Sequence, residues 1–554
     1  MPAPAFSWKS YEIQVPPASP LRALAVAVDL PAAPQTVTVQ LPDLTAWPSP
    51  LDKAEILLES AAEVEHALMA QYLYAAYSLK SSDEVTDPAQ QTALDETSPD
   101  SWPQVLLGIA REEMGHLITV QNLLLMLGLT PNLEREDFPP QKDLYPFALH
   151  LEPLSQRSLA KYVVAEAPGD AQGIEDIVEL AQEAAGAPIN RVGVLYGLLG
   201  LVFSTKEGVR QGTSGHEEWD AMIRELSRVA YQQSAPKSWH LPDSAFDAQT
   251  VGQQADPDDW QVGDLRVHRV SERTAAVQAI RDVGEQGEGP TNEGELSHFG
   301  RFLGIYRGGG GIPAFPAAGA WVPTREVPTD PKVDADIDEP RTKRWVQLAD
   351  IRYALLLGFV EHYLLAAGDA RRILTGWIFA EMRSRVAFIA RKLTIMPRAG
   401  GGAPGPVAAV AFGLPSVLHL PADDAARWAI HRERTEDAIA KVEEMQVADG
   451  EDKADPYLAN LLASDRARLV FIDAGATGTS FVRDILPLFR PKDIEHMSNL
   501  NLDLSEYDAV RAKAQAIAQR VAASGRPMPP PPDQRWTKIQ IELFEQWVAE
   551  GFPR

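Results

Sequence analysis

Two long apolar stretches near the start of the chain limit what it can fold into. The stretch over 51–80 contains no proline or glycine and repeats apolar residues at three- and four-residue steps. This period of about 3.6 residues predicts a helix. A second helix is expected over 102–127, closed by Gly128 and Pro131. These helices, and others further along, predict a mainly α chain with a helical core near 50–395.

The remaining sequence suggests four segments. Short β-branched runs predict a β or extended N-terminal segment over 1–48, followed by a helical domain over 49–400. A glycine-rich run predicts a linker and irregular region over 401–480, and a small helical module is expected over 481–554. The other expected helices lie at about 155–166, 174–185, 189–206, 271–289, 341–367 and 371–396.

Composition excludes several classes of function. The chain has 51 basic and 77 acidic residues and a formal charge of -26, which argues against nucleic-acid and anionic-membrane partners. It contains no cysteine, which excludes disulfides, Cys-ligated zinc, iron–sulfur clusters and a cysteine nucleophile. Any metal must therefore be held by His, Asp and Glu. The sequence has no apolar run of the ~20 residues that cross a bilayer and no signal-peptide core, so a cytoplasmic location is expected.

Titratable residues lie on the apolar faces of the first two helices. Helical steps place Glu113 and His116 on the core side of the second helix, and Glu65 among apolar neighbours on the first. Burying such groups is costly unless they are paired or bind a metal. A Glu together with a Glu-x-x-His pair is the ligand set with which ferritin-like bundles hold two metal ions.

A second Glu-x-x-His pair occurs in "GELSHFGRF", as Glu295 and His298. Glu295 also fits a capping box with Asn292 at a helix start. Glu288 is therefore a rival for the carboxylate that accompanies His298. The alternative without metal is a core in which Arg or backbone donors satisfy both pairs.

Other polar residues on the expected helices have simpler interpretations. His66 and Glu112 lie off the core faces, and we expect them on the surface or behind the metal ligands. His362 and Glu381 lie on apolar helices without a spaced partner, and satisfied polar groups of the core are the expectation for both.

Several stretches in chain order carry a family resemblance. They read "EVEHALMAQYLYAAYSL", "AREEMGHLITVQNLLLMLG", "LYPFALHLEPLS", "RVGVLYGLL", "EQGEG" and "SHFGRF". Together they resemble the ferritin-like domain of the iminophenyl-pyruvate dimer synthases, enzymes of bisindole pigment and alkaloid biosynthesis. The resemblance covers about residues 50–310 and extends weakly to about 396. It implies a ferritin-like helical bundle with additional helices for the domain over 49–400.

The resemblance also implies a set of metal ligands. These would be Glu65, Glu113, His116 and His298, with Glu288 or Glu295 from the other side. The third long helix supplies no acid, so its expected Glu must come from elsewhere, from Glu288 or from Glu166. The C-terminal module resembles c-type cytochrome domains, but the absence of cysteine excludes covalent haem.

By this resemblance the chain is expected to be a non-haem di-iron oxidative enzyme of secondary metabolism, with manganese as the alternative metal. Its substrate would be an amino-acid-derived imine or α-keto acid, and dioxygen the second reactant. Tyr72 is expected to line the pocket or to donate a hydrogen bond. A homo-oligomer is one of the possible assemblies. The competing hypothesis is a non-catalytic metal-binding or scaffold protein, which the missing acid on the third helix favours.

Overall fold

The computed structural model of the chain divides into two compact units. The first comprises residues 1–254 and 267–324, and the second comprises residues 255–266 and 325–554. The structure describes residues 7–15, 35–140, 145, 147–168, 171–186, 189–212, 214–246, 248–260, 265–288, 296–317, 319–366, 368–399, 405–415, 418–448, 450–474, 479–523, 528–529 and 535–554. Its described part is mainly α, which confirms the predicted fold class.

The first unit begins with a two-stranded sheet. Strand β1 (Trp8–Val15) pairs antiparallel with β2 (Gln35–Pro42), in a register that sets Trp8 opposite Pro42. The β-branched residues of "TVTVQLP" suit this extended conformation. The short β segment expected at the N-terminus is therefore present.

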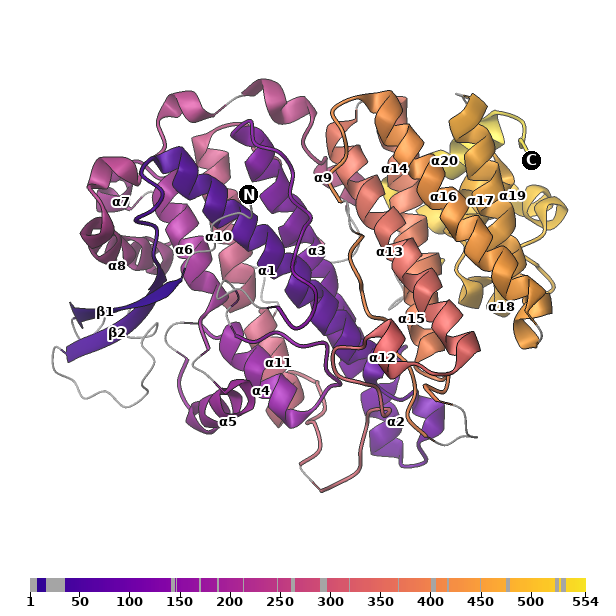
Figure 1. Cartoon of the computed structure of the whole chain (residues 1–554), viewed down its shortest axis with the longest axis horizontal. Helices are drawn as coiled ribbons and strands as arrows, with labels where there is room; N and C mark the ends of the chain where they lie inside the picture. The colour runs from indigo at the N-terminus through magenta and orange to yellow at the C-terminus, as the bar shows by residue number, and fades with distance from the viewer. Residues whose placement is uncertain are drawn as a thin grey trace. The chain divides into compact units, whose positions relative to one another are not determined.

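Four helices form the bundle of the first unit: α1 (Pro50–Ser78), α3 (Trp102–Met126), α6 (Val192–Phe203) and α10 (Arg273–Glu288). Helix α1 packs against α3 and α6, and α10 packs against α6 and α3 (Figure 1). A capping box between Ser49 and Asp52 starts α1. Gly128, with a φ of 72°, follows α3 in a left-handed conformation that suits glycine.

Shorter helices surround this bundle. Helix α11 (His298–Arg307) packs against α4 (Gln156–Ala165), which also contacts α5 (Glu175–Ala185). Helix α8 (Glu217–Gln233) packs on α6, where Gly197 and Gly200 permit a close approach. A Cβ at either glycine would lie 2.5 Å from a side chain of α8. The first unit also contains α2 (Pro88–Leu94) and α7 (Lys206–Gln211).

The second unit is also helical. Helix α13 (Pro340–Leu365) packs against α14 (Asp369–Ala380) and α16 (Asp424–Val447), and α16 packs against α17 (Pro456–Ala474). The helix expected over 371–396 is interrupted, because a π-helix at Glu381–Val386 separates α14 from α15 (Ala387–Leu393). The other helices are α9 (Pro257–Trp260), α12 (Val333–Asp336), a π-helix at Phe481–Ile485, α18 (Pro491–Ser498), α19 (Tyr507–Ala522) and α20 (Lys538–Ala549).

Two expectations about organisation differ from the structure. The region over 401–480 is not irregular throughout, because it contains α16 and α17. The buried stripe of α16 begins with Arg427, His431 and Thr435, so an apolar period does not reveal this helix. In addition, α13 to α15 group with the C-terminal helices, whereas a single helical domain was expected over 49–400.

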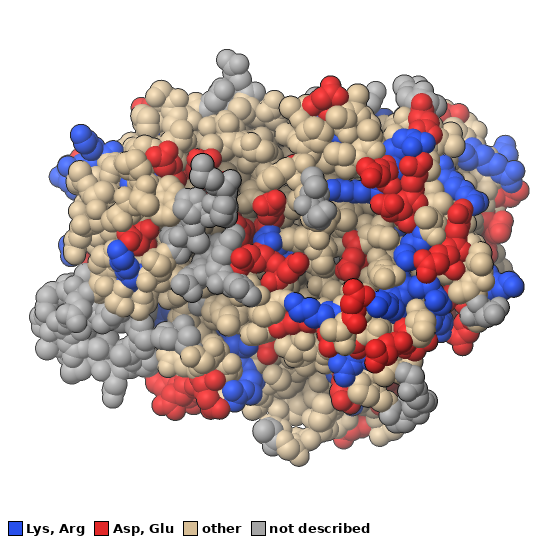
Figure 2. Space-filling model, in the orientation of Figure 1, with Lys and Arg blue, Asp and Glu red and all other residues tan. Residues whose placement is uncertain are grey.

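On the face shown in Figure 2, acidic and basic side chains are interspersed. None of the described helices combines the length and the apolar composition that crossing a bilayer requires.

Candidate metal centre

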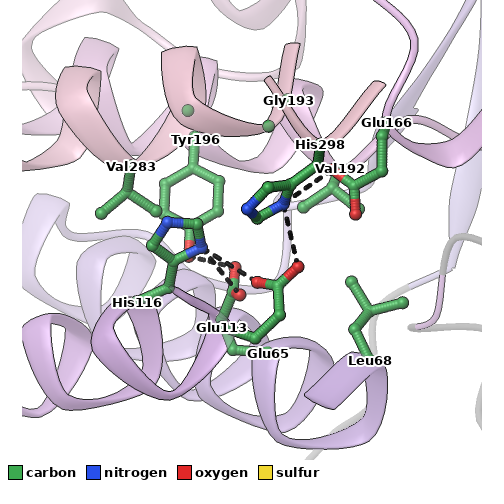
Figure 3. Close-up of a pocket in the computed structure, with 12 residues that line it drawn as sticks. Glu65, Leu68, Glu113, His116, Glu166, Val192, Gly193, Tyr196, Val283 and His298 are labelled. Carbon is green, nitrogen blue, oxygen red and sulfur yellow. Dashed lines mark hydrogen bonds and ion pairs between the residues drawn. The ribbon is translucent and has the colours of Figure 1, made fainter. Parts of the chain in front are cut away.

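Five titratable side chains meet inside the first unit. Glu65 comes from α1, Glu113 and His116 come from α3, Glu166 follows the last residue of α4, and His298 is the first residue of α11. All five are at most 4% exposed. Their side chains point toward one another, with both imidazole rings close to the carboxylates (Figure 3).

The five residues form two groups that share Glu113. One group is Glu65, Glu113 and His116, and the other is Glu113, Glu166 and His298. Within each group, one potential ligand atom per residue lies within 4.8 Å of the others. Each group alone could hold a metal ion, and together they describe a paired site.

The two oxygens of Glu113 face different histidines. Its Oε2 lies 2.9 Å from Nδ1 of His116, and its Oε1 lies 3.1 Å from Nδ1 of His298. Glu65 Oε2 is 3.4 Å from the same nitrogen of His116, and Glu166 Oε2 is 3.8 Å from that of His298. Glu113 is therefore placed as a bridging carboxylate would be.

The local sequence explains how each histidine is held. The i, i+3 spacing puts Glu113 and His116 on the same side of α3, one turn apart. Ser297 caps α11 by accepting the backbone N–H of Gly300 at 3.2 Å. This cap fixes His298 in the first helical turn, where it faces the bundle.

The outer nitrogens of both histidines bind a second set of polar residues. Nε2 of His298 lies 2.8 Å from Glu112 Oε2, and Nε2 of His116 lies 3.0 Å from Gln286 Oε1. Gln286 also donates to Glu112 at 2.9 Å, and Arg301 forms an ion pair with that carboxylate. When the Nε2 atoms donate these hydrogen bonds, the inner Nδ1 atoms are left as acceptors that can bind a metal.

Two tyrosines hold the outer carboxylates. Tyr72 donates to Glu166 Oε1 at 2.7 Å, so it has one of the two roles expected for it. Tyr196 donates a hydrogen bond to Glu65 Oε1 and lines the site. Sequence reasoning missed Tyr196, although it lies on α6, the helix noted as supplying no acid. A buried tyrosine among apolar residues that needs a hydrogen-bond partner was the available signal.

Burial and mutual charge shift the pKa values of the site in opposite directions. Burial raises the pKa of Glu65, and the neighbouring Glu113 adds to this, giving about 8. Burial lowers the pKa of His116, but the Glu113 and Glu65 carboxylates outweigh this and raise the pKa to about 10. His298 likewise has a pKa well above its ordinary value, because Glu113 and Glu112 outweigh burial. The protein without metal therefore retains protons here that a metal ion would displace.

The donor atoms fit a bound cation. Glu65 Oε2, Glu113 Oε1 and His298 Nδ1 are buried and lie within ion-pair distance of neighbouring groups, but none of the three makes a hydrogen bond of acceptable geometry. Unsatisfied buried polar atoms are rare and call for an explanation such as an ion. The cavity between them measures about 10 Å³, which is the size of a water molecule or an ion. A Cβ at Gly287 would lie 2.8 Å from Glu166 Oε2, so this glycine leaves room for the carboxylate.

Most of the predicted site residues meet at this centre. Glu65, Glu113, His116 and His298 lie together, and Glu166, one of the candidates named for the missing acid, completes the second group. Glu295 lies outside the described residues. Glu288 is the last residue of α10, but its side chain also lies outside the described part of the structure.

Glu112 and His66 were each expected on the surface or behind the metal ligands, and the surface position is wrong for both residues. Glu112 is 2% exposed and hydrogen-bonds His298, so it lies behind the histidine and not on the surface. His66 is fully buried, and its Nδ1 lies 2.8 Å from the carbonyl oxygen of Leu133. Both α1 and α3 are buried on almost all sides, so a position off the apolar stripe does not reach solvent.

His362 is a satisfied core residue, as predicted, whereas Glu381 is a core residue whose Oε1 is paired and whose Oε2 has no hydrogen-bond partner. His362 lies 3.0 Å from His431 Nε2 through its Nδ1 and 2.9 Å from Asp424 Oδ1 through its Nε2. Glu381 is fully buried and forms ion pairs with arginine side chains of the second unit.

Comparison with known proteins agrees with this architecture. A family model described as Ferritin-like matches residues 58–307. A dichlorochromopyrrolate synthase from Lentzea aerocolonigenes is 26% identical over 270 residues, which span 44% of this chain and 23% of that protein. The matched part of the chain thus covers less than a quarter of the length of this relative. No solved structure is significantly similar to the chain.

Proposed function

We propose that the chain is a non-haem di-iron oxidative enzyme. The proposal starts from the match of residues 58–307 to the Ferritin-like family model. The observation that carries this proposal is the pair of buried Glu/His groups that share Glu113. A carboxylate between two sites neutralises charge at both and keeps the two ions close. Imidazole and carboxylate are suitable ligands for iron.

The residues have distinct roles in this proposal. Glu65 and His116 would hold one iron, Glu166 and His298 would hold the other, and Glu113 would bridge them. Manganese is the alternative metal, because the same oxygen and nitrogen ligands suit it. The distances among the five side chains support this assignment, as do the three buried atoms without hydrogen-bond partners.

Bound iron would supply electrons for the reduction of dioxygen. The chain's own residues provide the environment for that chemistry. Tyr72 and Tyr196 orient the outer carboxylates through hydrogen bonds, and Gln286 and Glu112 orient the imidazoles. Leu68, Val192 and Val283 line the site beside the ligands and limit the access of water.

The proposed substrate is an amino-acid-derived imine or α-keto acid. Support comes from the distant similarity to a named synthase and from the family resemblance of the motifs. The cavity of about 10 Å³ is too small for such a molecule. Lining side chains must therefore move before the substrate can approach, or oxidation must occur from the edge of the site.

The competing scaffold hypothesis loses its main support. It rested on the absence of an acid from the third long helix of the bundle. Glu166 supplies a carboxylate from the end of α4, and Tyr72 holds it in place. The carboxylate whose absence favoured the scaffold hypothesis is thus available from another helix, which supports the proposal of a two-metal centre.

Oxygen uptake tests the proposed activity. The full chain is loaded with ferrous iron without oxygen, excess metal is removed, and oxygen consumption is followed after mixing with aerated buffer. We expect uptake in proportion to bound iron, and its loss in His298→Ala. Glu63→Gln is the matched control, because Glu63 is buried on α1 but accepts from Tyr145 at 3.3 Å, away from the site. Iron-loaded protein that consumes no oxygen would overturn the enzymatic proposal.

A further inference from the structure

A chain of hydrogen bonds runs behind both histidines of the candidate metal centre. It starts at Nε2 of His116, which lies 3.0 Å from Gln286 Oε1. The amide nitrogen of Gln286 donates to Glu112 Oε2 at 2.9 Å, and the same oxygen lies 2.8 Å from Nε2 of His298. One amide and one carboxylate therefore join the outer nitrogens of the two histidines.

Three helices contribute to this chain of hydrogen bonds. Glu112 and His116 lie on α3, Gln286 lies on α10, and His298 and Arg301 lie on α11. Both histidines and Glu112 are buried, and Gln286 is half-buried. The two imidazole rings are stacked, with centroids 5.4 Å apart and planes at 29°. Nearly parallel rings can present their outer nitrogens to one connected pair of side chains.

Glu112 determines which way the amide of Gln286 points. Its Oε2 forms an ion pair with Arg301, and an ionised carboxylate can only accept hydrogen bonds. The NH₂ group of Gln286 must therefore face Glu112, which leaves the amide oxygen for His116. Turning the amide round would place its oxygen against the carboxylate oxygen, with no proton between them.

The fixed amide in turn determines which nitrogen of His116 binds a metal. Because an amide oxygen only accepts, Nε2 of His116 must carry a proton, and Nδ1 is left to face Glu113. Glu112 has the same effect on His298 directly, so its Nδ1 also faces Glu113. A single carboxylate thus selects the metal-binding nitrogen on both sides of the centre.

We propose that Gln286 couples the two metal subsites by carrying the orientation set at Glu112 to His116. This inference rests on the proposed di-iron function, because it concerns how the two halves of that centre fill. An ion bound at one histidine holds its ring in place. That orders the shared amide and carboxylate, so the other histidine is already oriented when the second ion arrives. Gln286 is a positioning residue, since it acts on the centre through His116 and Glu112.

Two matched variants test the coupling. Gln286→Met keeps an unbranched side chain of similar length but removes both the donor and the acceptor. Gln121→Met is the control, because Gln121 is fully buried on α3 and its amide also makes two hydrogen bonds. It donates to the carbonyl oxygen of Asn132 at 2.8 Å and accepts the backbone N–H of that residue at 2.7 Å. Circular dichroism confirms that both variants are folded.

Proton NMR of the full chain loaded with cobalt(II) supplies a readout that does not depend on activity. The N–H of each metal-bound imidazole gives a strongly shifted signal that disappears as it exchanges with D₂O. The wild type and Gln121→Met are expected to show two slowly exchanging signals, and Glu166→Ala identifies the one from His298. Gln286→Met is expected to speed exchange at both histidines. It should also weaken both ions by about 10–100-fold in competition with a chelator.

The response of His298 decides the outcome, because Gln286 acts on it through Glu112. Changes confined to the His116 signal, or two ions bound with wild-type affinity in folded Gln286→Met, would overturn the coupling. The same changes in Gln121→Met would overturn it as well, since they would reflect a general loss of stability. A wild type that binds one cobalt ion or none would instead overturn the two-metal centre, and the coupling with it.

Discussion

Glu112 accepts a hydrogen bond from Nε2 of His298 at 2.8 Å, on the side of the ring opposite Glu113. Two adjacent residues of α3 thus contact the two nitrogens of one imidazole. Arg301 and His298 counter the effect of burial and lower the pKa of Glu112 to about 2, so it remains an acceptor at neutral pH. Its position fixes which nitrogen of His298 faces the centre.

Glu112→Gln is expected to weaken metal binding by about 10–100-fold without preventing it, because residues behind the ligands orient them. The measurement is competition with a chelator, using cobalt(II), whose visible spectrum reports the ligand set. Glu63→Gln on α1 is the control and is expected to bind like the wild type. If the wild type binds two ions and Glu112→Gln binds them equally tightly, the orienting role of Glu112 is wrong.

Glu166 is predicted to be the acid that completes the second half of the site. Glu166→Ala should remove one of two metal ions per chain, because Glu65, Glu113 and His116 remain to hold the other. Glu295→Ala should retain both. Metal analysis after gel filtration separates the variants, and the reverse pattern would transfer the ligand role to Glu295.

Metal binding is predicted to release protons and to strengthen with rising pH. The raised pKa values of His116, about 10, and Glu65, about 8, mean that the metal-free site holds protons at pH 7. In the metal-free protein, a raised histidine pKa stabilises the fold below about pH 6.5, and this contribution is lost as pH rises toward 10. The increase in Tm on adding metal should therefore grow between pH 6 and 9. An increase that shrinks with pH would contradict these protonation states.

The buried ion cluster of the second unit should be sensitive to loss of a carboxylate. Asp465 accepts from Arg352 at 3.0 Å and is fully buried. Asp465→Asn should lower the free energy of unfolding by about 3–5 kcal/mol, since it leaves buried guanidinium groups less compensated. Asp473→Asn on the same helix is the control, because its pair with Arg432 is exposed and screened by solvent, so its loss should change stability little. Urea denaturation compares them, and equal effects would mean that the cluster is not stabilising.

Much of the first unit could be predicted from apolar periodicity. The helices expected over 51–80 and 102–127 occur as α1 and α3, and helical steps correctly grouped Glu65, Glu113 and His116. Such steps describe one helix at a time. They could not show that α11, through Arg301, covers the side of α3 on which Glu112 lies.

The acid opposite His298 was less accessible to sequence reasoning. Glu166 follows the end of α4 and belongs to no spaced pair, so only the packing of α4 against α11 brings it to the site. Long-range packing of this kind leaves no local period. The polar buried stripe of α16 escaped prediction for a related reason, since its neighbours, and not its own sequence, make it a core helix.

Iron content per chain tests the central claim most directly. The full-length wild type, Glu113→Ala and Glu63→Gln are reconstituted with ferrous iron under argon, and bound iron is measured against protein concentration. Glu113 belongs to both groups, so the account predicts two irons per chain in the wild type and the control, and loss of both in Glu113→Ala. One iron or fewer in the wild type, or two irons retained in folded Glu113→Ala, would contradict a paired centre bridged by Glu113.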